Sequence, residues 1–342
     1  MKAAVYHGPR DIRIDSVAEP GPPEPGHLVL EVIRAAICGT DSSEWDHGPL
    51  LARPPVVLGH EFVGRVVAAG EGVDGVSLGD RVVSGAGVSC GECEWCLAGR
   101  TNLCARYFTL GLHVDGGLAE LVSSPASICR AVPDACTDEA AAMAQPLAVA
   151  LHAVRRSGVT SGQVCAVIGV GGIGAFIVAA AAARGASPLI ACDIDGQRLE
   201  TARRIGAHET IDVRGRDLTE VLLEATGGEG AHVVIEASGA PHAPAAALSA
   251  TRRGGRVLLV GLQSAPRELD LFSMTVREVE VTTTLAHVCD VDLPESLGLL
   301  AGTELAEIVL DRTVPLTSLV DQGIRPLADG TARGKILVDP AA

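Results

Sequence analysis

The sequence predicts an α/β protein with two domains, and three observations support this prediction. A chain of 342 residues is longer than one ordinary hydrophobic core requires, so two domains are expected. The first part of the chain contains short β-rich runs that Gly and Pro interrupt, which is typical of an irregular β-barrel-like domain. From residue 164 onward, short apolar runs alternate with helical patterns, as in a doubly wound parallel sheet.

The β-rich pattern predicts a first domain over residues 1–152, to which the chain returns at 288–342. Runs such as "HLVLEVIRAAI" at 27–37 and "FVGRVVAAG" at 62–70 carry this pattern. The sequence "GKILVDP" near the C-terminus has the same character and predicts one more strand of this domain. The first domain is therefore expected to consist of two segments of the chain.

The middle of the chain, residues 153–287, predicts a second domain with a parallel sheet. Helical spacing at 196–205 and 215–226 supplies crossover connections between its strands. Six strands are expected, the number in a complete doubly wound sheet. They are predicted at 164–168, 188–192, 208–212, 232–236, 256–260 and 279–285.

Composition and charge argue against several classes of function. The net charge is −15 and no basic stripe is present, whereas nucleic-acid binding depends on Lys and Arg that neutralise phosphates. The start "MKAAVYHGPRDIRID" lacks the apolar segment of a signal peptide, and the longest apolar stretch, at 175–183, is too short to span a bilayer. We therefore expect a cytoplasmic protein whose ten cysteines stay reduced, which favours metal binding over disulfides.

Four cysteines gather in the loop "CGECEWCLAGRTNLC" at residues 90–104, with the spacing C-x2-C-x2-C-x7-C. Four thiolates around one tetrahedral zinc leave no open position, so this pattern predicts a structural zinc site. An iron–sulfur cluster is a chemical alternative, but the bacterial ferredoxin run has a shorter last gap and a Pro after its final cysteine. Free or paired thiols remain a further alternative. The predicted ligands are Cys90, Cys93, Cys96 and Cys104.

Cys38, His60 and Glu61 form a second candidate metal site. They are a soft, a borderline and a hard ligand for zinc. On a regular strand His60 and Glu61 would point to opposite faces, so both reach one ion only if the backbone is irregular, which Gly59 permits. Taken singly, Cys38 and His60 are better explained as a buried thiol and a core histidine, but together with the spacing they favour a metal site.

A glycine-rich turn follows the first predicted strand of the second domain. Gly169-x-Gly171-x-x-Gly174 comes after an apolar strand and before an Ala-rich helix, and Asp193 ends the next strand. In this context the glycines allow close approach of a dinucleotide pyrophosphate to the helix N-terminus. Asp193 would accept from a ribose 2′-hydroxyl and repel a 2′-phosphate, so NAD is favoured over NADP. The candidate cofactor-binding residues are Gly169, Gly171, Gly172, Ile173, Gly174, Asp193 and the nearby Arg198.

The spacing G-H-E-x2-G-x5-G-x2-V from Gly59 to Val73, with the four-cysteine loop, resembles the zinc-dependent medium-chain alcohol dehydrogenase family over essentially the whole chain. The stretch "QPLAVALHAV" at 145–154 looks most like the polyol and 2,3-butanediol dehydrogenase branch. The resemblance implies a GroES-like catalytic domain in two segments, an inserted six-stranded Rossmann domain, two Zn²⁺ ions per chain and NAD.

The resemblance also implies roles for single residues. A catalytic zinc with an open position would be held by Cys38 and His60, with Glu61 or Gln145 as a further ligand. The family has Cys or Glu just before a Pro-Leu pair, where this chain has Gln145. Thr40 is where the family places the first hydroxyl of a proton relay. The next relay position, often His, is Ser43 here, so His47 or water would have to take that part.

The implied activity is hydride transfer between NAD and a secondary alcohol, vicinal diol or polyol, which gives the ketone. Alternatives are a sugar or L-threonine dehydrogenase of the same family, or a dinucleotide-binding relative without turnover. The resemblance further implies a homodimer or homotetramer that acts on a small molecule and binds neither nucleic acid nor membrane. The strand at 279–285 is a plausible edge for pairing between subunits.

Overall fold

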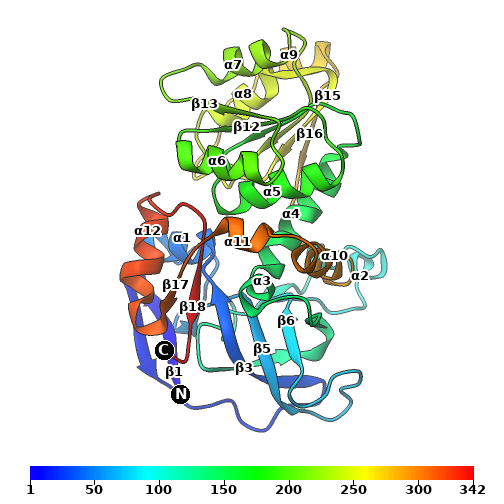
Figure 1. The fold of residues 1–342 in the computed structure, drawn as a ribbon. Coiled ribbons are helices and arrows are strands. Elements are labelled where there is room, and N and C mark those ends of the chain that lie inside the picture. The colour runs from blue at the N-terminus through cyan, green and yellow to red at the C-terminus, as the bar shows by residue number, and fades with distance from the viewer. The chain divides into compact units, whose positions relative to one another are not determined.

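The computed structural model describes all residues, 1–342, and the chain divides into two compact units. The first unit combines Met1–Ala148 with Val288–Ala342, and the second is Val149–His287. The sequence placed the boundary a few residues later, after residue 152. The division falls inside one helix, α4 (Ala144–Ser157), where no change of composition marks it. Both chain termini lie in the first unit (Figure 1).

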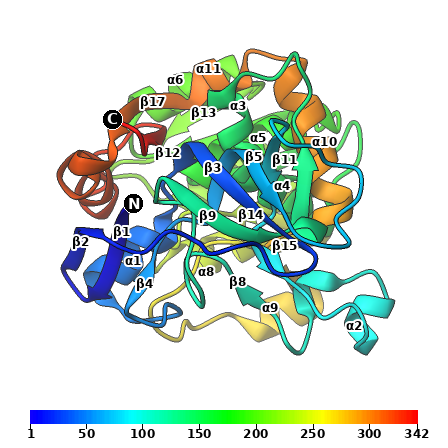
Figure 2. The ribbon, with the colours of Figure 1, turned by 90° about the horizontal axis from the view of Figure 1, so that it is seen from below.

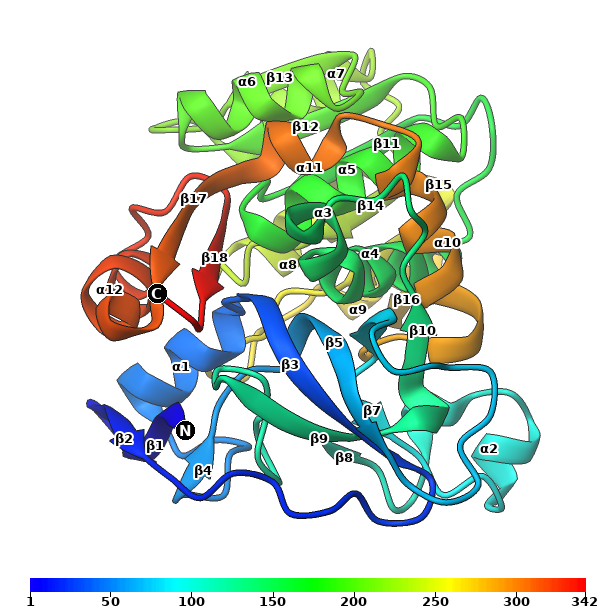
Figure 3. The same ribbon diagram turned by 60° about the horizontal axis from the view of Figure 1, so that its bottom comes forward.

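The first unit is built on β-sheet, as its Gly- and Pro-interrupted runs predicted. A seven-stranded sheet has the order β10-β6-β5-β3-β18-β17, and β9 also pairs with β3. Figure 3 shows β3 between β5 and β9. A three-stranded sheet, β2-β1-β4, and the pair β7-β8 complete the unit. The strands are β1 Lys2–Gly8, β2 Asp11–Ser16, β3 His27–Ala36, β4 Val56–Val57, β5 Glu61–Ala69, β6 Arg81–Ser84, β7 Gly87–Val88, β8 Phe108–Thr109, β9 Leu121–Pro125, β10 Cys129–Ala131, β17 Leu310–Pro315 and β18 Lys335–Asp339.

Short helices connect these strands. The loop that carries α2 projects from the edge of the first unit (Figure 2). The helices of this unit, with the connecting α4, are α1 Gly39–His47, α2 Glu94–Leu97, η1 Thr101–Leu103, η2 Ala126–Ile128, α3 Asp138–Ala142, α10 Cys289–Ala301, α11 Leu305–Val309, η3 Leu316–Ser318, η4 Leu319–Ile324 and α12 Arg325–Ala328.

The C-terminal segment completes the sheet of the first unit. β18 pairs antiparallel with the end of β3 and parallel with β17, so the last strand of the chain lies beside one of its first. Ile336 and Val338 join the same apolar core as Leu30 and Phe62. The C-terminal segment therefore joins the first unit both through strand pairing and through a shared hydrophobic core.

The second unit is the predicted doubly wound α/β domain. Its six strands are all parallel and have the order β13-β12-β11-β14-β15-β16, so the direction of winding reverses between β11 and β14. Such a reversal is where ligands bind in open parallel sheets. The strands are β11 Cys165–Ile168, β12 Leu189–Asp193, β13 Glu209–Asp212, β14 Ala231–Glu236, β15 Thr251–Leu259 and β16 Glu280–Thr283.

Helices cover both faces of this sheet. In Figure 1, α5 and α6 lie on one face, and α7 and α8 lie on the other. The core between them is almost entirely aliphatic, as expected for a chain with only 2% aromatic residues. None of the helices in the structure combines the length and apolar character that crossing a membrane would require. The helices of this unit are α5 Gly172–Ala183, α6 Gly196–Arg204, α7 Leu218–Ala225, α8 Ala243–Ser249 and α9 Leu271–Val276.

Candidate metal centres and dinucleotide site

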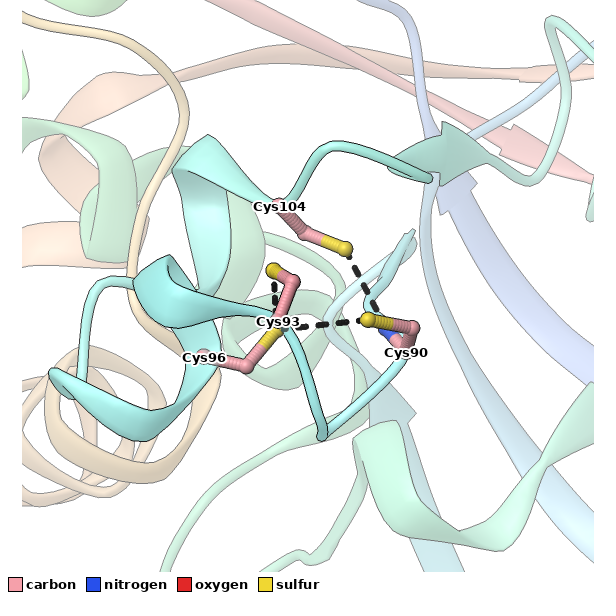
Figure 4. A group of neighbouring side chains, drawn as sticks. All are labelled: Cys90, Cys93, Cys96 and Cys104. Atoms are coloured by element: carbon pink, nitrogen blue, oxygen red, sulfur yellow. Dashed lines mark hydrogen bonds between the residues drawn. The ribbon is translucent and has the colours of Figure 1, made fainter.

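The four sulfur atoms of the cysteine loop converge on one point (Figure 4). Cys93 is the N-cap of α2, Cys96 lies within this helix, and Cys104 follows η1. The Sγ atom of Cys96 lies 3.6 Å from that of Cys93 and 3.9 Å from that of Cys90. Sulfurs that ligate one tetrahedral zinc at about 2.3 Å lie roughly 3.8 Å apart. The loop therefore has the dimensions of a single-zinc site.

These distances also separate the alternatives for the loop. A disulfide requires its sulfurs to be about 2.05 Å apart, and all ten cysteines of the chain are free. Four sulfurs this close leave room for one ion but not for a cluster of several irons. Hydrogen bonds from the backbone N–H of Glu92 and the side chain of Arg106 lower the pKa of Cys90 to about 6, which favours the thiolate that metal binding needs.

The second candidate metal centre brings together Cys38, His60 and Glu61. Their ligand atoms all lie within 4.8 Å of one another. Cys38 is the N-cap of α1, directly after the end of β3, and His60 precedes the first residue of β5. A thiolate, an imidazole and a carboxylate at these distances match the donor set and the size of a zinc site.

Gly59 produces the irregular backbone that this convergence requires. Its φ is +100°, a conformation that side chains disfavour. A Cβ atom at this position would also lie 2.5 Å from the backbone nitrogen of Leu118. The turn at Gly59 therefore accepts only glycine, and it allows His60 and Glu61 to approach Cys38 together.

Asp41 lies beside this group and is fully buried. Its Oδ2 accepts from the backbone N–H of Cys38 at 2.9 Å, and its Oδ1 lies 3.6 Å from His60 Nδ1. Burial lowers the pKa of His60, but the negative charges of Asp41 and Cys38 outweigh burial and raise it to about 10. The surroundings of the imidazole are therefore negative and favour a cation.

Lys335 is a member of the site that the sequence interpretation missed. Its Nζ donates to Glu61 Oε2 and, at 2.9 Å, to the carbonyl oxygen of Ile37, and both charged side chains are buried. The one signal in the sequence that could have pointed to Lys335 is the rarity of lysine, since only two of the 27 Lys and Arg residues are lysines. Lys335 holds one oxygen of Glu61, so Glu61 is anchored next to the metal position and not free to swing.

The remaining predicted residues of this site lie on two helices. Gln145 is buried in the first turn of α4 and stays a predicted ligand. Thr40, Ser43 and His47 all lie on α1. Ser43 Oγ donates to the carbonyl oxygen of Gly39 at 3.0 Å, which keeps this hydroxyl on its own helix.

His47 lies at the far end of α1 from the metal ligands. It is exposed, and its Nε2 lies 3.5 Å from Asp46 Oδ2. It lies nine positions after Cys38 in the sequence, which corresponds to about 13 Å along the helix axis. The structure therefore does not bring His47 or Ser43 into contact with Cys38, His60 or Glu61.

Glu44 orders the loop that follows α1. Its carboxylate is buried and accepts from the backbone N–H groups of Leu50, Leu51 and Ala52. The guanidinium groups of Arg10 and Arg325 lie 4.4 and 5.9 Å from the ring centroid of the neighbouring Trp45. Both residues therefore support the structure of α1 and its loop.

The glycine turn of the second unit has the geometry that close packing requires. Gly169 has φ +86°, and Gly171 is the N-cap of α5, which begins at Gly172. A Cβ atom on Gly174 would lie 1.9 Å from the carbonyl oxygen of Gly169. The N-terminus of α5 therefore stands at the carboxyl end of β11, beside the reversal of the strand order.

Asp193 ends β12 next to this turn and is buried. Its Oδ2 accepts from Val170 N at 2.8 Å, and its Oδ1 accepts from the backbone N–H groups of Ile194 and Asp195 at 2.8 and 2.9 Å. Arg198 Nη1 lies 3.9 Å from Asp193 Oδ1. Asp193 thus holds the glycine turn in place in addition to any contact with a ribose.

If the cysteine loop binds zinc, loss of one of its four ligands should release the ion and loosen the loop. We expect Cys96→Ser to reduce the zinc content from about two ions to about one ion per chain and to open the loop to trypsin at the exposed Arg100 and Arg106. Metal analysis and mass spectrometry of the digest measure both effects. Cys136→Ser, at a cysteine outside the loop, is the control. Full zinc content with a resistant loop in Cys96→Ser would contradict the assignment.

The ion pair of Lys335 and Glu61 is expected to stabilise the chelator-treated protein. Lys335→Met leaves a buried carboxylate unpaired and should lower the free energy of unfolding by about 3–5 kcal/mol. The double variant Lys335→Met/Glu61→Gln removes both charges and should recover most of this loss. Urea unfolding in the presence of a chelator measures the effect.

The chain offers a matched control for this test in its other lysine, Lys2, whose replacement by Met should change stability by less than about 0.5 kcal/mol. Equal losses in the Lys335→Met single variant and the double variant would show that the effect is one of packing and not of charge.

Comparison with known proteins agrees with this geometry. Residues 24–134 match the alcohol dehydrogenase GroES-like domain, and residues 172–301 match the zinc-binding dehydrogenase family. Sorbitol dehydrogenase of Bacillus subtilis (strain 168) is 36% identical over 270 residues, 77% of this chain and 76% of the relative.

Two solved structures superimpose on the chain with a TM-score of 0.91 and cover 99% of both chains. The first is 2R,3R-butanediol dehydrogenase from Bacillus subtilis, 31% identical. The second is a zinc-binding dehydrogenase from Sinorhizobium meliloti 1021 bound to NADP, 30% identical. The chain therefore belongs to the zinc-dependent medium-chain alcohol and polyol dehydrogenase family, as its glycine, histidine and cysteine motifs predicted.

Proposed function

We propose that this enzyme oxidises a secondary alcohol, vicinal diol or polyol to the ketone, with NAD as the hydride acceptor. The observation that carries the proposal is the convergence of Cys38, His60 and Glu61 within 4.8 Å in a chain of this family. The names of its relatives, a sorbitol and a 2R,3R-butanediol dehydrogenase, support a substrate with neighbouring hydroxyl groups.

The residues of the first unit would hold a zinc ion and keep its surroundings fixed. When bound, zinc supplies a Lewis acid for the alcohol oxygen, and the dinucleotide supplies the hydride acceptor. Cys38 and His60 are the proposed protein ligands, and Glu61 or Gln145 is the proposed third. Asp41 orients the segment at Cys38 through its hydrogen bond to the backbone N–H of that residue.

Asp193 supports the preference for NAD over NADP. A buried carboxylate beside the glycine turn would accept from ribose hydroxyls and repel a 2′-phosphate. Arg198 is the one cation next to it, at 3.9 Å. Because a relative from S. meliloti is bound to NADP, the ratio of the activity with NAD to the activity with NADP is the measurement that tests this preference.

The proton of the alcohol is proposed to leave through Thr40 and water. Thr40 lies two residues after Cys38, in the first turn of α1. The hydroxyl of Ser43 donates a hydrogen bond to the carbonyl oxygen of Gly39, and His47 is exposed at the other end of α1. Water therefore replaces the histidine that related enzymes often carry.

We further propose that the protein works in the cytoplasm, because ten free cysteines suit a reducing compartment. The second candidate activity is oxidation of a sugar or of L-threonine, since these substrates require the same metal and cofactor residues. A dinucleotide-binding relative without turnover has no use for the convergent Cys38, His60 and Glu61.

The activity is tested by NADH formation with a panel of vicinal diols, polyols, sugars, L-threonine and simple alcohols. We expect turnover of at least one diol or polyol, at least ten times faster with NAD than with NADP. Cys38→Ala should retain the fold, bind one zinc per chain and lose at least about 100-fold in kcat/KM, because zinc chemistry is worth several kcal/mol. A wild-type protein with two zincs that turns over nothing in the panel would contradict the proposal.

We also propose a homodimer that pairs through β16. This strand is the outer edge of the six-stranded sheet, and an open edge of this kind favours pairing with another chain. Large apolar side chains are exposed on the segment that surrounds it. They are Leu262, Leu271, Phe272, Val276 and Leu285, with exposed fractions of 51–83%.

Light scattering coupled to gel filtration tests this arrangement. Wild-type protein should have the mass of a dimer or of a tetramer of such dimers, and Phe272→Glu should shift the population toward smaller species. Leu78→Glu, at an equally exposed leucine in the first unit, should leave the mass unchanged. A monomeric wild type would overturn the proposal.

A further inference from the structure

A small basic cavity lies at the amino end of the parallel sheet of the second unit. It has a volume of about 220 Å³ and is lined by Gln163, His232, Val233 and the segment Arg252–Arg256. Gln163 precedes β11, and His232 is the second residue of β14. The glycine turn stands at the carboxyl ends of the same strands. The cavity is therefore separate from the dinucleotide site.

An interruption of β15 forms one wall of this cavity. In the pairing of β14 with β15, Ala231 lies opposite Thr251, but Val233 already lies opposite Arg256. Five residue steps along β15 thus match two along β14, so residues 252–255 form a bulge within β15. Gly254 has φ +66° and donates its backbone N–H to the carbonyl oxygen of Arg277 at 2.8 Å, which fixes the bulge.

Three guanidinium groups line the cavity, and no carboxylate lines it. Arg253 Nη1 donates to the carbonyl oxygen of Val276, and Arg256 Nη1 donates to that of Gly158, at 3.0 and 3.1 Å. Each contact fixes a guanidinium group and leaves other N–H groups of it available. Arg256 also pairs with Glu280, which does not line the cavity, at 3.1 Å. Such a concentration of positive charge is unexpected in a chain with net charge −15.

His232 supplies independent evidence that an acceptor belongs here. The backbone N–H of Val164 lies 3.2 Å from its Nδ1, and Nη1 of Arg252 lies 2.7 Å from its Nε2. Both neighbours can only donate, whereas a neutral imidazole accepts at one nitrogen only. One donor therefore lacks an acceptor in this arrangement. An anion that accepts from Arg252 and from a protonated Nε2 would supply one.

From these contacts we infer that the cavity binds a phosphate group, either as inorganic phosphate or as part of a phosphorylated small molecule. Planar guanidinium groups bind phosphate through paired N–H donors, and three of them line this cavity. The volume lies below the range of about 300–1,000 Å³ for sites that enclose drug-sized ligands. The cavity therefore suits one phosphate group and not a whole nucleotide.

A second hollow of the same unit shows that this charge pattern is not general. It is larger, about 440 Å³, and its lining includes Glu209, Asp212 and Glu224 against the single Arg216. Phosphate would be repelled there. Arg216 is therefore a suitable position for a control variant.

Isothermal titration with inorganic phosphate at constant ionic strength tests the inference. Because the N-terminus of α5 is another place where phosphate can bind, the titrations use Gly171→Asp as background. The new side chain has open space at this N-cap, and its carboxylate repels phosphate from the glycine turn. Phosphate should still bind to this variant, at one site per chain.

In the same background, Arg252→Gln should weaken phosphate binding at least tenfold, because the substitution removes one of the guanidinium groups that line the cavity. The substitution should leave the fold intact, because the side chain of Arg252 contacts only His232. Arg216→Gln should leave the affinity unchanged. Absence of phosphate binding to Gly171→Asp, or equal affinity with and without Arg252→Gln, would overturn the inference. Circular dichroism of each variant verifies folding.

A second titration, with glycerol 3-phosphate and with glycerol, distinguishes the two sources of the phosphate group. Binding of the ester at least as tightly as inorganic phosphate supports a phosphorylated small molecule. Binding of inorganic phosphate alone supports the free ion. Equal binding of glycerol and its phosphate ester would show that the phosphate group is not what the cavity recognises, and would overturn the inference. None of these readouts depends on dehydrogenase activity.

Discussion

The buried ion pair between Lys335 and Glu61 joins parts of the chain that are 274 residues apart. It fixes the last strand of the chain to the segment that carries His60 and Glu61. The same ammonium group donates to the carbonyl oxygen of Ile37, directly before Cys38. One cation therefore contacts both stretches of backbone from which the proposed zinc ligands project, and the first unit needs its C-terminal segment for the site as well as for its sheet.

Charge balance explains why this group of residues is buried together. Glu61 and the fully buried Asp41 are the carboxylates of the group, and each lies beside a cationic partner: Lys335 pairs with Glu61, and His60, whose pKa is raised, lies beside Asp41. Buried charges without partners are strongly unfavourable, so these residues can be buried only together. The cysteine loop follows the same rule near the protein surface, where backbone N–H groups and Arg106 favour the thiolate of Cys90. Metal binding at either centre would therefore be coupled to folding.

In the second unit, the dinucleotide site and the arginine-lined cavity lie at opposite ends of the same sheet. Its carboxyl end carries the glycine turn and Asp193, which hold each other through the hydrogen bond to Val170. Its amino end carries the arginine-lined cavity, one wall of which is the bulge in β15. The parallel arrangement separates these ends by the length of the strands. A ligand at the amino end would therefore act without competing for the dinucleotide position.

The sequence by itself determined the features that depend on local spacing. The six parallel strands, the turn Gly169–Gly174 and the family could be predicted, because each rests on residues close together in the chain. The convergence of Cys90, Cys93, Cys96 and Cys104 was predictable for the same reason. Gly59 indicated an irregular backbone at His60 because glycine is permissive in φ wherever it occurs.

Only the tertiary structure decided the contacts between distant segments. Lys335 meets Glu61 because β18 pairs with β3, and no local pattern records that pairing. α1 buries Asp41, Glu44 and Trp45 against the rest of the first unit and leaves His47 exposed, which the sequence alone does not decide. Arg252 and His232 become neighbours because β14 and β15 lie side by side. Long-range electrostatic and hydrogen-bonded contacts depend on positions in space, whereas the sequence pattern specifies only positions along the chain.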